Sequence, residues 1–415
     1  MTAAPLSLFA PAESDFRYKE QKAILEQSGW CSAGRPLLEP KFPLIPLAVM
    51  NIPLHSSPLE IFLRVFGDDA INHMIKTFNS SVRLSRSPYN ALRRWEFIRY
   101  LGMHLIAQLR DELTLQQLFT GSSKPPGSLG YRRFCFIHQN RSYDPHLLYK
   151  MLCRSFGSYC GEGNSWALDE LKSPWNGDSP LVTFTPRKPH PTGIDIWLVC
   201  ARLPNGRPYA IAFKPRLIAG EKYEIYDIAV ELLQAWGNLP TAHLTADAFY
   251  DVRALRNAIQ GIRDGTHVYT LSGHSGRDSH LWRCLHTELK SQNWVAWKHI
   301  TTGEYVTSFV SKKVFNTRTT YFVENEEGLV DQESAPRLLY KAQFGIVDSF
   351  NKLFYKKHWS RQTKSHLHNL FDSFFQMAVV NSFALSTNVN PSGCTTIVRF
   401  MINLAEEMLH VSKRN

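Results

Sequence analysis

The fold class is decided by residues 166–213, which contain WALDEL (166–171), LVTFT (181–185), IDIWLVC (194–200) and YAIAF (209–213). The last three segments are rich in β-branched and aromatic residues, and turns containing Pro or Gly separate them. This pattern predicts consecutive β-strands. Before this stretch the apolar residues recur at helical spacing, so the sequence predicts a helical region that gives way to a sheet near residue 166.

Two helices are predicted in the region before the sheet. The first begins at Ser57-Pro58, where Pro suits the first helical position, and has apolar residues at i, i+3, i+4 and i+7 counted from Leu59. The second runs from about Trp95 to Leu109 and directs its apolar residues toward one side. The segment from about 50 to 165 is therefore expected to be mainly helical.

The order of elements after the three strands completes the predicted fold class. We expect a helix over 222–236, an apolar strand ending at Ala246-Asp247, and a helix over 252–262. Short β segments follow between 267 and 323, and a final helical region runs from about 344 to 410. The order β-β-β-α-β-α is that of an RNase H-like core, in which acidic residues from two strands and a helix converge.

Three aspartates stand at the positions where such a core carries its acidic residues. Asp169 lies in WALDEL, Asp247 in AHLTADAF and Asp348 in FGIVDSF, and each interrupts or ends a stretch that is otherwise expected to be buried. A buried carboxylate needs a partner, and a metal ion is the most economical one. Two Mg²⁺ or Mn²⁺ ions roughly 4 Å apart, held by carboxylate oxygens, are suited to phosphodiester chemistry.

Each aspartate also has an ordinary structural interpretation. Asp247 fits the N-cap of the following helix, Asp348 fits the start of a helix, and Asp169 fits a solvated strand end. The metal interpretation depends on all three occurring together in this order along the chain.

Composition sets limits on the partners and on the compartment. The chain has 415 residues, of which 44% are hydrophobic, so it is long enough for two or more packed units. Its Lys and Arg residues number 47 against 36 Asp and Glu, and the net charge of +11 favours an anionic partner such as nucleic acid. Its seven scattered cysteines form no C-x-x-C pair, which disfavours a zinc domain and a disulfide framework. No apolar run has the length of a membrane span, so we expect a soluble intracellular protein without a membrane partner.

Ordered blocks along the chain resemble the piggyBac-like transposases, a DDE/DDD class, from about residue 57 to 388. All three aspartates lie within these blocks. In chain order the blocks are SPLEIF (57–62), WEFI (95–98), LDE (168–170), WNG (175–177), RKP (187–189), LTADAF (244–249), GIVDSF (345–350) and SRQTK (360–364).

The resemblance implies a mixed α+β or α/β architecture with an RNase H-like catalytic domain over 166–351. A β-rich insertion at about 275–335 interrupts that domain. A mainly helical dimerisation and DNA-binding domain would be built from both sides of the core, from 46–165 and 352–415. Residues 1–45, which contain several prolines and little periodicity, are expected to form a flexible N-terminal arm.

The same resemblance implies the reaction and its participants. The family excises its element through DNA hairpin intermediates and inserts it at TTAA targets. Asp169, Asp247 and Asp348 would be the catalytic residues and would hold two Mg²⁺ or Mn²⁺ ions, while a water and then a 3′-hydroxyl attack phosphorus. The expected partners are double-stranded DNA, as transposon ends and target, and a second copy of the chain in a homodimer. The expected location is the nucleus.

Basic residues that follow the third aspartate, interleaved with aromatic ones, suit contacts to phosphates and stacking on an exposed base. A solvated helix face with core aromatics is the alternative. Single lysines after the first aspartate are further candidates, although isolated lysines are usually surface residues. The residues predicted to contact DNA are Lys188, Lys214, Lys352, Lys356, Lys357, Arg361 and Lys364.

The three aspartates favour an enzyme, but three features of the sequence depart from the family pattern. Asn351 stands where the family often has a further aspartate, Asp195 stands where a lysine is common, and no cysteine-rich zinc domain is evident before Asn415. One alternative is a domesticated DNA-binding protein that keeps the fold without the reaction. Another is an RNase H-like nuclease that only hydrolyses, which would lack the flanking helical blocks.

Overall fold

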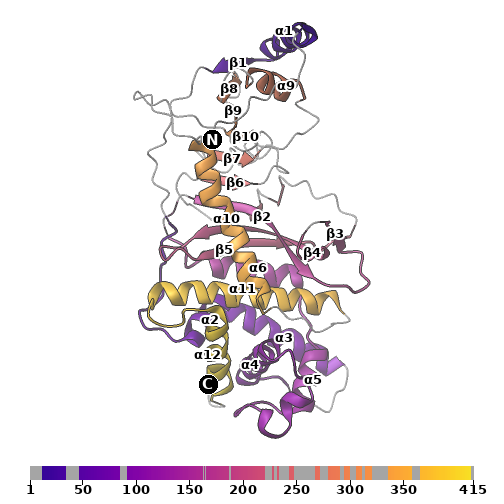
Figure 1. The fold of residues 1–415 in the computed structure, drawn as a ribbon. Helices are drawn as coiled ribbons and strands as arrows, with labels where there is room; N and C mark the ends of the chain where they lie inside the picture. Colours follow the sequence, from indigo (N-terminus) through magenta and orange to yellow (C-terminus); the bar gives the residue numbers. More distant parts are fainter. Residues whose placement is uncertain are drawn as a thin grey trace. The chain divides into compact units, whose positions relative to one another are not determined.

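The computed structural model divides the chain into two compact units, one formed by Met1–Pro43 with His243–Phe344 and the other by Leu44–Ala242 with Gly345–Asn415. We call them unit 1 and unit 2 (Figure 1). The described residues are 12–33, 46–84, 91–161, 163, 165–186, 188–219, 227–228, 231–232, 243–246, 267–271, 279–289, 294–299, 305–310, 314–319, 335–357 and 365–412.

Unit 2 contains a sheet in which β2 (Ser165–Pro174) pairs with β4 (Thr192–Arg202), and β4 pairs with β5 (Pro208–Pro215). Both pairings are antiparallel. The predicted strands at 194–200 and 209–213 are confirmed, and WALDEL is itself part of a strand. The segment predicted at 181–185 forms only the short β3 (Val182–Phe184), which pairs with the start of β4.

The central strand is buried along most of its length. From Ile196 to Ala201 every residue of β4 is buried, so the strand is covered on both faces. Its sequence is accordingly a continuous apolar run and not an alternation of apolar and polar residues. Asp169 of β2 lies opposite Leu198 of β4. The first predicted aspartate therefore lies opposite the buried part of the central strand.

Helices from both ends of unit 2 pack together beside this sheet (Figure 1). The first predicted helix begins as expected: the Ser57 hydroxyl accepts from the Glu60 N–H, and the Glu60 carboxylate accepts from the Ser57 N–H, which forms a capping box. The helices are α2 (Pro58–Phe66), α3 (Asp68–Leu84), α4 (Arg94–Leu109), α5 (Tyr131–Gln139), α6 (Pro145–Gly157), α11 (His366–Val389) and α12 (Ile397–Leu409), with 3₁₀ turns at Gln117–Phe119 and Gly121–Ser123.

The longest of these helices, α11, connects the sheet to the other helices. All its residues from Asn369 to Thr387 are buried, as expected for a helix that is surrounded on every side. It packs against α2, α6 and β5, and the Asn381 side chain bonds both the N–H and the C=O of Ala210 in β5, at 2.9 and 2.7 Å. The segment after the third aspartate therefore forms the centre of unit 2.

Unit 1 contains a sheet in the order β1-β8-β9-β10-β7-β6. Its neighbouring strands are antiparallel except β6 and β7, which are parallel. The strands are β1 (Trp30–Ala33), β6 (His243–Ala246), β7 (His267–Leu271), β8 (Trp294–His299), β9 (Tyr305–Val310) and β10 (Val314–Thr319), and the helices are α1 (Ala12–Gln27) and α9 (Ser279–Glu288).

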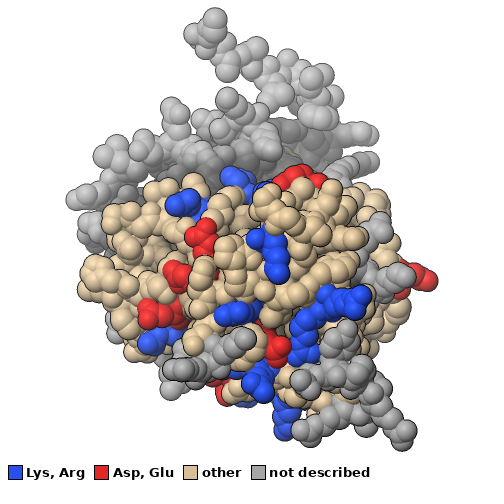
Figure 2. Space-filling model, turned by 90° about the horizontal axis from the view of Figure 1, so that it is seen from below, with Lys and Arg blue, Asp and Glu red and all other residues tan. Residues whose placement is uncertain are grey.

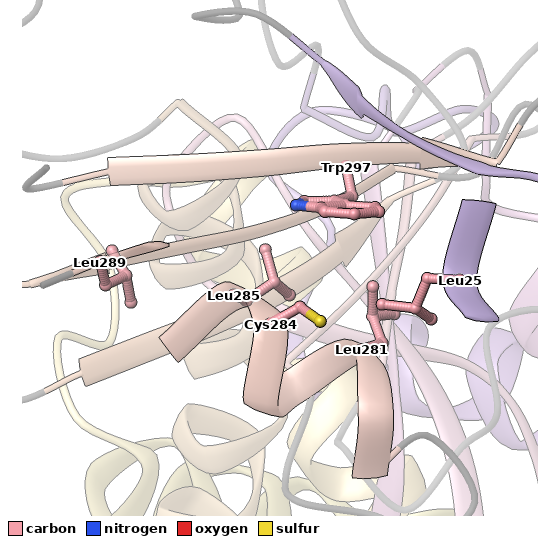
Figure 3. Packing of buried hydrophobic residues seen from close by; sticks show 6 residues of the cluster. All are labelled: Leu25, Leu281, Cys284, Leu285, Leu289 and Trp297. Atoms are coloured by element: carbon pink, nitrogen blue, oxygen red, sulfur yellow. The ribbon is translucent and has the colours of Figure 1, made fainter. Parts of the chain in front are cut away.

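Residues 1–45 were expected to form a flexible arm without regular structure. This prediction is wrong for the residues that form α1 and β1. Helix α1 packs against α9, and β1 adds to the edge of β8. Figure 3 shows the shared core of Leu25 from α1, Trp297 from β8, and Leu281, Cys284, Leu285 and Leu289 from α9 and its end. Polar contacts border it: the Tyr18 hydroxyl and the Trp297 Nε1 both donate to the Glu288 carboxylate, at 2.5 and 3.0 Å.

Helix α10 (Ala335–Tyr355) continues across the division between the two units, and its part from Gly345 belongs to unit 2. The predicted helix at 252–262 lies outside the described residues, as does most of that at 222–236, where residues 227–228 and 231–232 are helical. No described helix is long and apolar enough to span a membrane.

Candidate active site

Asp169 lies in the middle of β2 and is 8% exposed. Its Oδ1 accepts a hydrogen bond of 2.7 Å from the backbone N–H of Glu170. The Glu170 side chain forms an ion pair with Lys188 Nζ at 2.8 Å. The carboxylate of Asp169 is thus oriented by its own strand, while the neighbouring glutamate is engaged elsewhere.

Asp348 occupies a different environment, on the exposed side of α10. The apolar residues Ile346, Val347, Phe350 and Phe354 form the buried side of the helix. The interpretation of FGIVDSF as a buried stretch interrupted by a carboxylate is therefore wrong at Asp348 itself. The segment is helical, so Asp348 projects away from its buried neighbours.

Tyr355 attaches this helix to the strand that carries Asp169. Its hydroxyl donates to the C=O of Lys172 at 2.7 Å and accepts from the N–H of the same residue at 3.1 Å. Burial raises the pKa of Tyr355 well above its ordinary value, outweighing the opposing hydrogen bond to the Lys172 backbone. The hydroxyl therefore stays protonated and keeps its donor role. We call this pair of hydrogen bonds the Tyr355 clamp.

The clamp and the Asp169 carboxylate lie at the same edge of β2. In an antiparallel ladder the N–H and C=O of one residue point to the same side, and every second residue points the same way. Because both groups of Lys172 bond Tyr355, they point away from β4, and so does the N–H of Glu170 two residues earlier. Asp169 Oδ1 accepts from that N–H. The carboxylate is therefore turned toward the edge to which α10 is attached.

Asp348, Asn351 and Tyr355 share one side of α10 because they are spaced i, i+3 and i+7. The side-chain oxygen of Asn351 is buried and has no hydrogen-bond partner among the described residues. An unsatisfied buried oxygen calls for a ligand such as water or a cation. From the sequence, Asn351 was expected to add no charge but still to hydrogen-bond a ligand or water, whereas the clamp was not identified.

Asp247 lies outside the described residues, directly after β6, whose residues Leu244, Thr245 and Ala246 are buried. Among the residues that the structure describes, no three His, Cys, Asp or Glu side chains lie together as metal ligands. The three predicted metal ligands thus remain a prediction, of which the structure describes two.

Several basic residues predicted to contact DNA have protein partners. Lys188 pairs with Glu170 at 2.8 Å, Lys357 pairs with Asp111 at 3.3 Å, and Lys214 pairs with Glu231. Burial opposes ionisation of Glu231, yet the bonds from Lys214 and Tyr149 outweigh it and lower its pKa.

The remaining residues predicted to contact DNA follow the third aspartate. Lys352 and Lys356 are exposed, and Arg361 and Lys364 lie outside the described residues. Of the aromatic residues among them, Phe354 is fully buried and Tyr355 forms the clamp. This favours the core interpretation for those two side chains over base stacking.

The charge of Asp195, which stands where the family often has a lysine, is compensated within the sheet. Its carboxylate receives Lys172 Nζ at 2.6 Å and Arg216 Nη2 at 3.4 Å, and Thr183 donates to it at 2.7 Å. Lys172 is almost fully buried in this network. Asp195 therefore has a structural role in joining β2, β3 and β4.

A second cluster, which sequence reasoning missed, lies within the helices of unit 2. Arg141 Nη1 donates to Asp372 Oδ1 at 2.5 Å, and His104 Nε2 lies 3.3 Å from the same oxygen. Both members of the pair are buried. Burial raises the pKa of Asp372 to about 6, although Arg141 opposes that shift. No local sequence signal marks a pair that is 231 residues apart.

Comparison with solved structures gives a likeness that covers most of the chain. The structure matches a cryo-EM structure of a piggyBac transposase synaptic complex with hairpin DNA, with a TM-score of 0.71 and 18% sequence identity. The match covers 87% of this chain and 82% of that one. The chain has a piggyBac-like fold. Neither a family model nor a curated protein sequence matches it, so the piggyBac-like assignment is one of fold.

Proposed function

We propose that this chain is a piggyBac-like DNA transposase that cleaves DNA strands and transfers them to a target. The observation that supports the proposal is the piggyBac-like fold over 87% of the chain. In this interpretation β2, β4 and β5 are the first three strands of an RNase H-like core. Asp169 stands on the first of them and Asp348 on the helix attached to it.

The oxygen donors of the candidate active site fit Mg²⁺ or Mn²⁺. Asp169 offers a largely buried carboxylate, and Asn351 offers a buried oxygen without a hydrogen-bond partner among the described residues. Hard divalent cations prefer such oxygens. We propose that Asp169, Asp247 and Asp348 hold two ions, with Asn351 as a neutral donor beside them. When bound, the ions would lower the pKa of an attacking water and neutralise charge at the phosphate.

The residues of the chain contribute orientation. The Glu170 N–H fixes the Asp169 carboxylate at the edge of β2, and the Lys188 pair keeps the Glu170 carboxylate away from that position. Asn351 adds an oxygen but no negative charge, so the centre would have three carboxylates. Lys352 and Lys356, exposed on and just after α10, are the described cations best placed to contact DNA phosphates.

The chain's positive charge does not by itself indicate which surface binds DNA. Figure 2 shows one face, on which Lys and Arg side chains are interspersed with Asp and Glu. A continuous basic surface would attract DNA more strongly than such a mixture. We therefore expect contacts near α10 to contribute more to binding than this face does. We also propose that two copies act together on the transposon ends, in the nucleus, and insert at TTAA-type targets.

The test is cleavage and strand transfer on labelled duplex DNA that carries the inverted repeats flanking the gene, with Mg²⁺ or Mn²⁺. We expect the intact chain to cleave and the variants Asp169→Asn and Asp348→Asn to lose at least 100-fold in rate, since each removes a proposed ligand. Asp69→Asn is the matched control, because Asp69 is exposed on α3 in the helical part of unit 2. Equal rates in all four proteins would refute the proposed catalytic role of Asp169 and Asp348.

A second candidate function is DNA binding without cleavage. It is favoured by Asn351, which removes one negative charge from the position where the family often has aspartate. Electrophoretic mobility shift with the same duplex distinguishes the two, because a DNA-binding protein without activity would retain the shift while yielding no cleaved strand in either metal.

A further inference from the structure

The Tyr355 hydroxyl makes two hydrogen bonds that join α10 to β2, both to the backbone of one residue. Lys172 receives both of them, at 2.7 and 3.1 Å. A contact to backbone is independent of the side chain at position 172, which instead points into the Asp195 network. The clamp therefore fixes the position of the helix relative to the strand and leaves side-chain chemistry to other residues.

The loop between β3 and β4 contacts both elements that the Tyr355 clamp joins, α10 and β2. The ring of His190 lies over the ring of Tyr355, with centroids 4.4 Å apart, and Lys188 of the same loop pairs with Glu170 beside Asp169. The two rings are tilted by 44°, and burial lowers the pKa of His190, which favours its neutral form. One loop thus contacts both the helix that carries Asp348 and the strand that carries Asp169.

Path lengths along the two elements are closely matched. Asp348 precedes Tyr355 by seven residues of helix, about 10.5 Å at 1.5 Å per residue. Asp169 precedes Lys172 by three residues of strand, about 10 Å at 3.4 Å per residue. Each aspartate is therefore about 10 Å from the clamp, measured along its own element.

We propose that Tyr355, whose ring packs against His190, is a positioning residue of the active site and that its hydroxyl sets the separation between Asp348 and Asp169. This inference rests on the proposed function, because it assigns Tyr355 to the metal centre proposed there. The hydroxyl touches neither ion nor DNA. It acts by holding α10 at the edge of β2, as residues behind metal ligands hold those ligands in place.

The test is the variant Tyr355→Phe, which keeps the ring and removes only the hydroxyl. The matched control is Tyr143→Phe, because the Tyr143 hydroxyl also donates to a backbone C=O, that of Leu367, in the helices of the same unit. A second variant, His190→Ala, keeps the clamp and removes the ring that packs against Tyr355. Thermal unfolding checks that all three variants are folded.

Two readouts that do not depend on catalysis are measured on the full chain. The first is Mn²⁺ binding followed by electron paramagnetic resonance, where we expect Tyr355→Phe to weaken affinity about 10-fold, as loss of a supporting contact does. His190→Ala is expected to weaken it by less, and Tyr143→Phe to leave it unchanged. The second is hydrogen exchange of the Lys172 amide, which should be faster in Tyr355→Phe alone.

The outcomes separate this inference from the proposed function. If the wild-type chain binds Mn²⁺ and Tyr355→Phe binds it equally well, the positioning role is refuted while the metal centre stands. Faster exchange at Lys172 with unchanged Mn²⁺ affinity also refutes it, since the clamp would then be structural only. If the wild-type chain binds Mn²⁺ more tightly than Tyr355→Phe does but cuts no DNA, the transposase proposal fails and the positioning role stands. No Mn²⁺ binding by the wild-type chain refutes both.

Discussion

Replacing Arg141 by Met tests whether the buried pair with Asp372 determines the stability of the helical part of unit 2. The substitution removes the bond of 2.5 Å to Asp372 and that of 3.1 Å from Arg141 Nε to the His138 C=O. It also removes the guanidinium that lies 5.0 Å from the Phe371 ring centroid. Removing one partner of a buried ion pair costs about 3–5 kcal/mol, because the other charge is left uncompensated.

The loss of stability caused by Arg141→Met should depend on pH, in a direction set by the titration of Asp372. With Arg141 present, burial already raises the pKa of Asp372 to about 6, and loss of the guanidinium raises it further. A folded-state pKa above the unfolded value means that the folded protein binds the proton more tightly, so stability falls as pH rises through that window. The variant therefore loses stability between pH 5 and pH 7.5, and it loses more than the wild type does.

The assay is urea unfolding of the full chain followed by tryptophan fluorescence at pH 5 and pH 7.5. We expect Arg141→Met to cost about 4 kcal/mol at pH 7.5 and about 2 kcal/mol at pH 5. The double variant Arg141→Met, Asp372→Leu should recover most of the loss, since it removes both charges. A cost below about 1 kcal/mol at pH 7.5, or an equal cost at both pH values, would refute the reasoning.

Three further predictions follow from particular contacts. Gly193→Ala should destabilise the sheet by about 1–3 kcal/mol, because its Cβ would lie 2.2 Å from the Ser173 C=O, whereas Gly345→Ala, with open space, should not lower the thermal midpoint. Burial lowers the pKa of His368 to about 4, so the folded protein disfavours protonation of this side chain. His368→Gln should therefore reduce the loss of stability on acidification from pH 6.5 to 4, as measured by thermal melts over that range. Deletion of residues 1–33 should speed amide exchange in α9 while leaving α11 unchanged, because α1 packs against α9 and β1 pairs with β8, both in unit 1, whereas α11 belongs to unit 2.

The sequence identified those parts of the fold whose local pattern matches their burial. The strands at 194–200 and 209–213 and the helix that starts at Pro58 are confirmed, because period and capping residues act over short distances. Helix α1 was missed because its side chains are mostly polar. Its apolar Leu25 is buried by packing against α9, more than 250 residues later in the sequence. Helical geometry likewise placed Asp348 on the exposed side of α10, against expectation.

The candidate active site shows the same division between local and distant information. Asp169 was found because it breaks an apolar strand, and the structure buries it there. The partners of Lys188 and Lys214 could not be read from the sequence, because each ion pair joins two segments that only the tertiary structure brings together. Tyr355 is seven residues from Asp348, a spacing that indicates a shared helix side. Its partner Lys172, 183 residues away, gave no such signal.

The docking of α1 onto α9 has a consequence for synthesis on the ribosome. Leu25 emerges early, but its contact Leu281 is translated 256 residues later. At about 5–20 residues per second this is a delay of roughly 13–50 s. During that interval α1 lacks the residues of α9 that bury Leu25, so chaperones and proteases have access to this helix before it packs. Nascent chains halted before residue 280 should be cut by added protease within α1, and finished chains should resist.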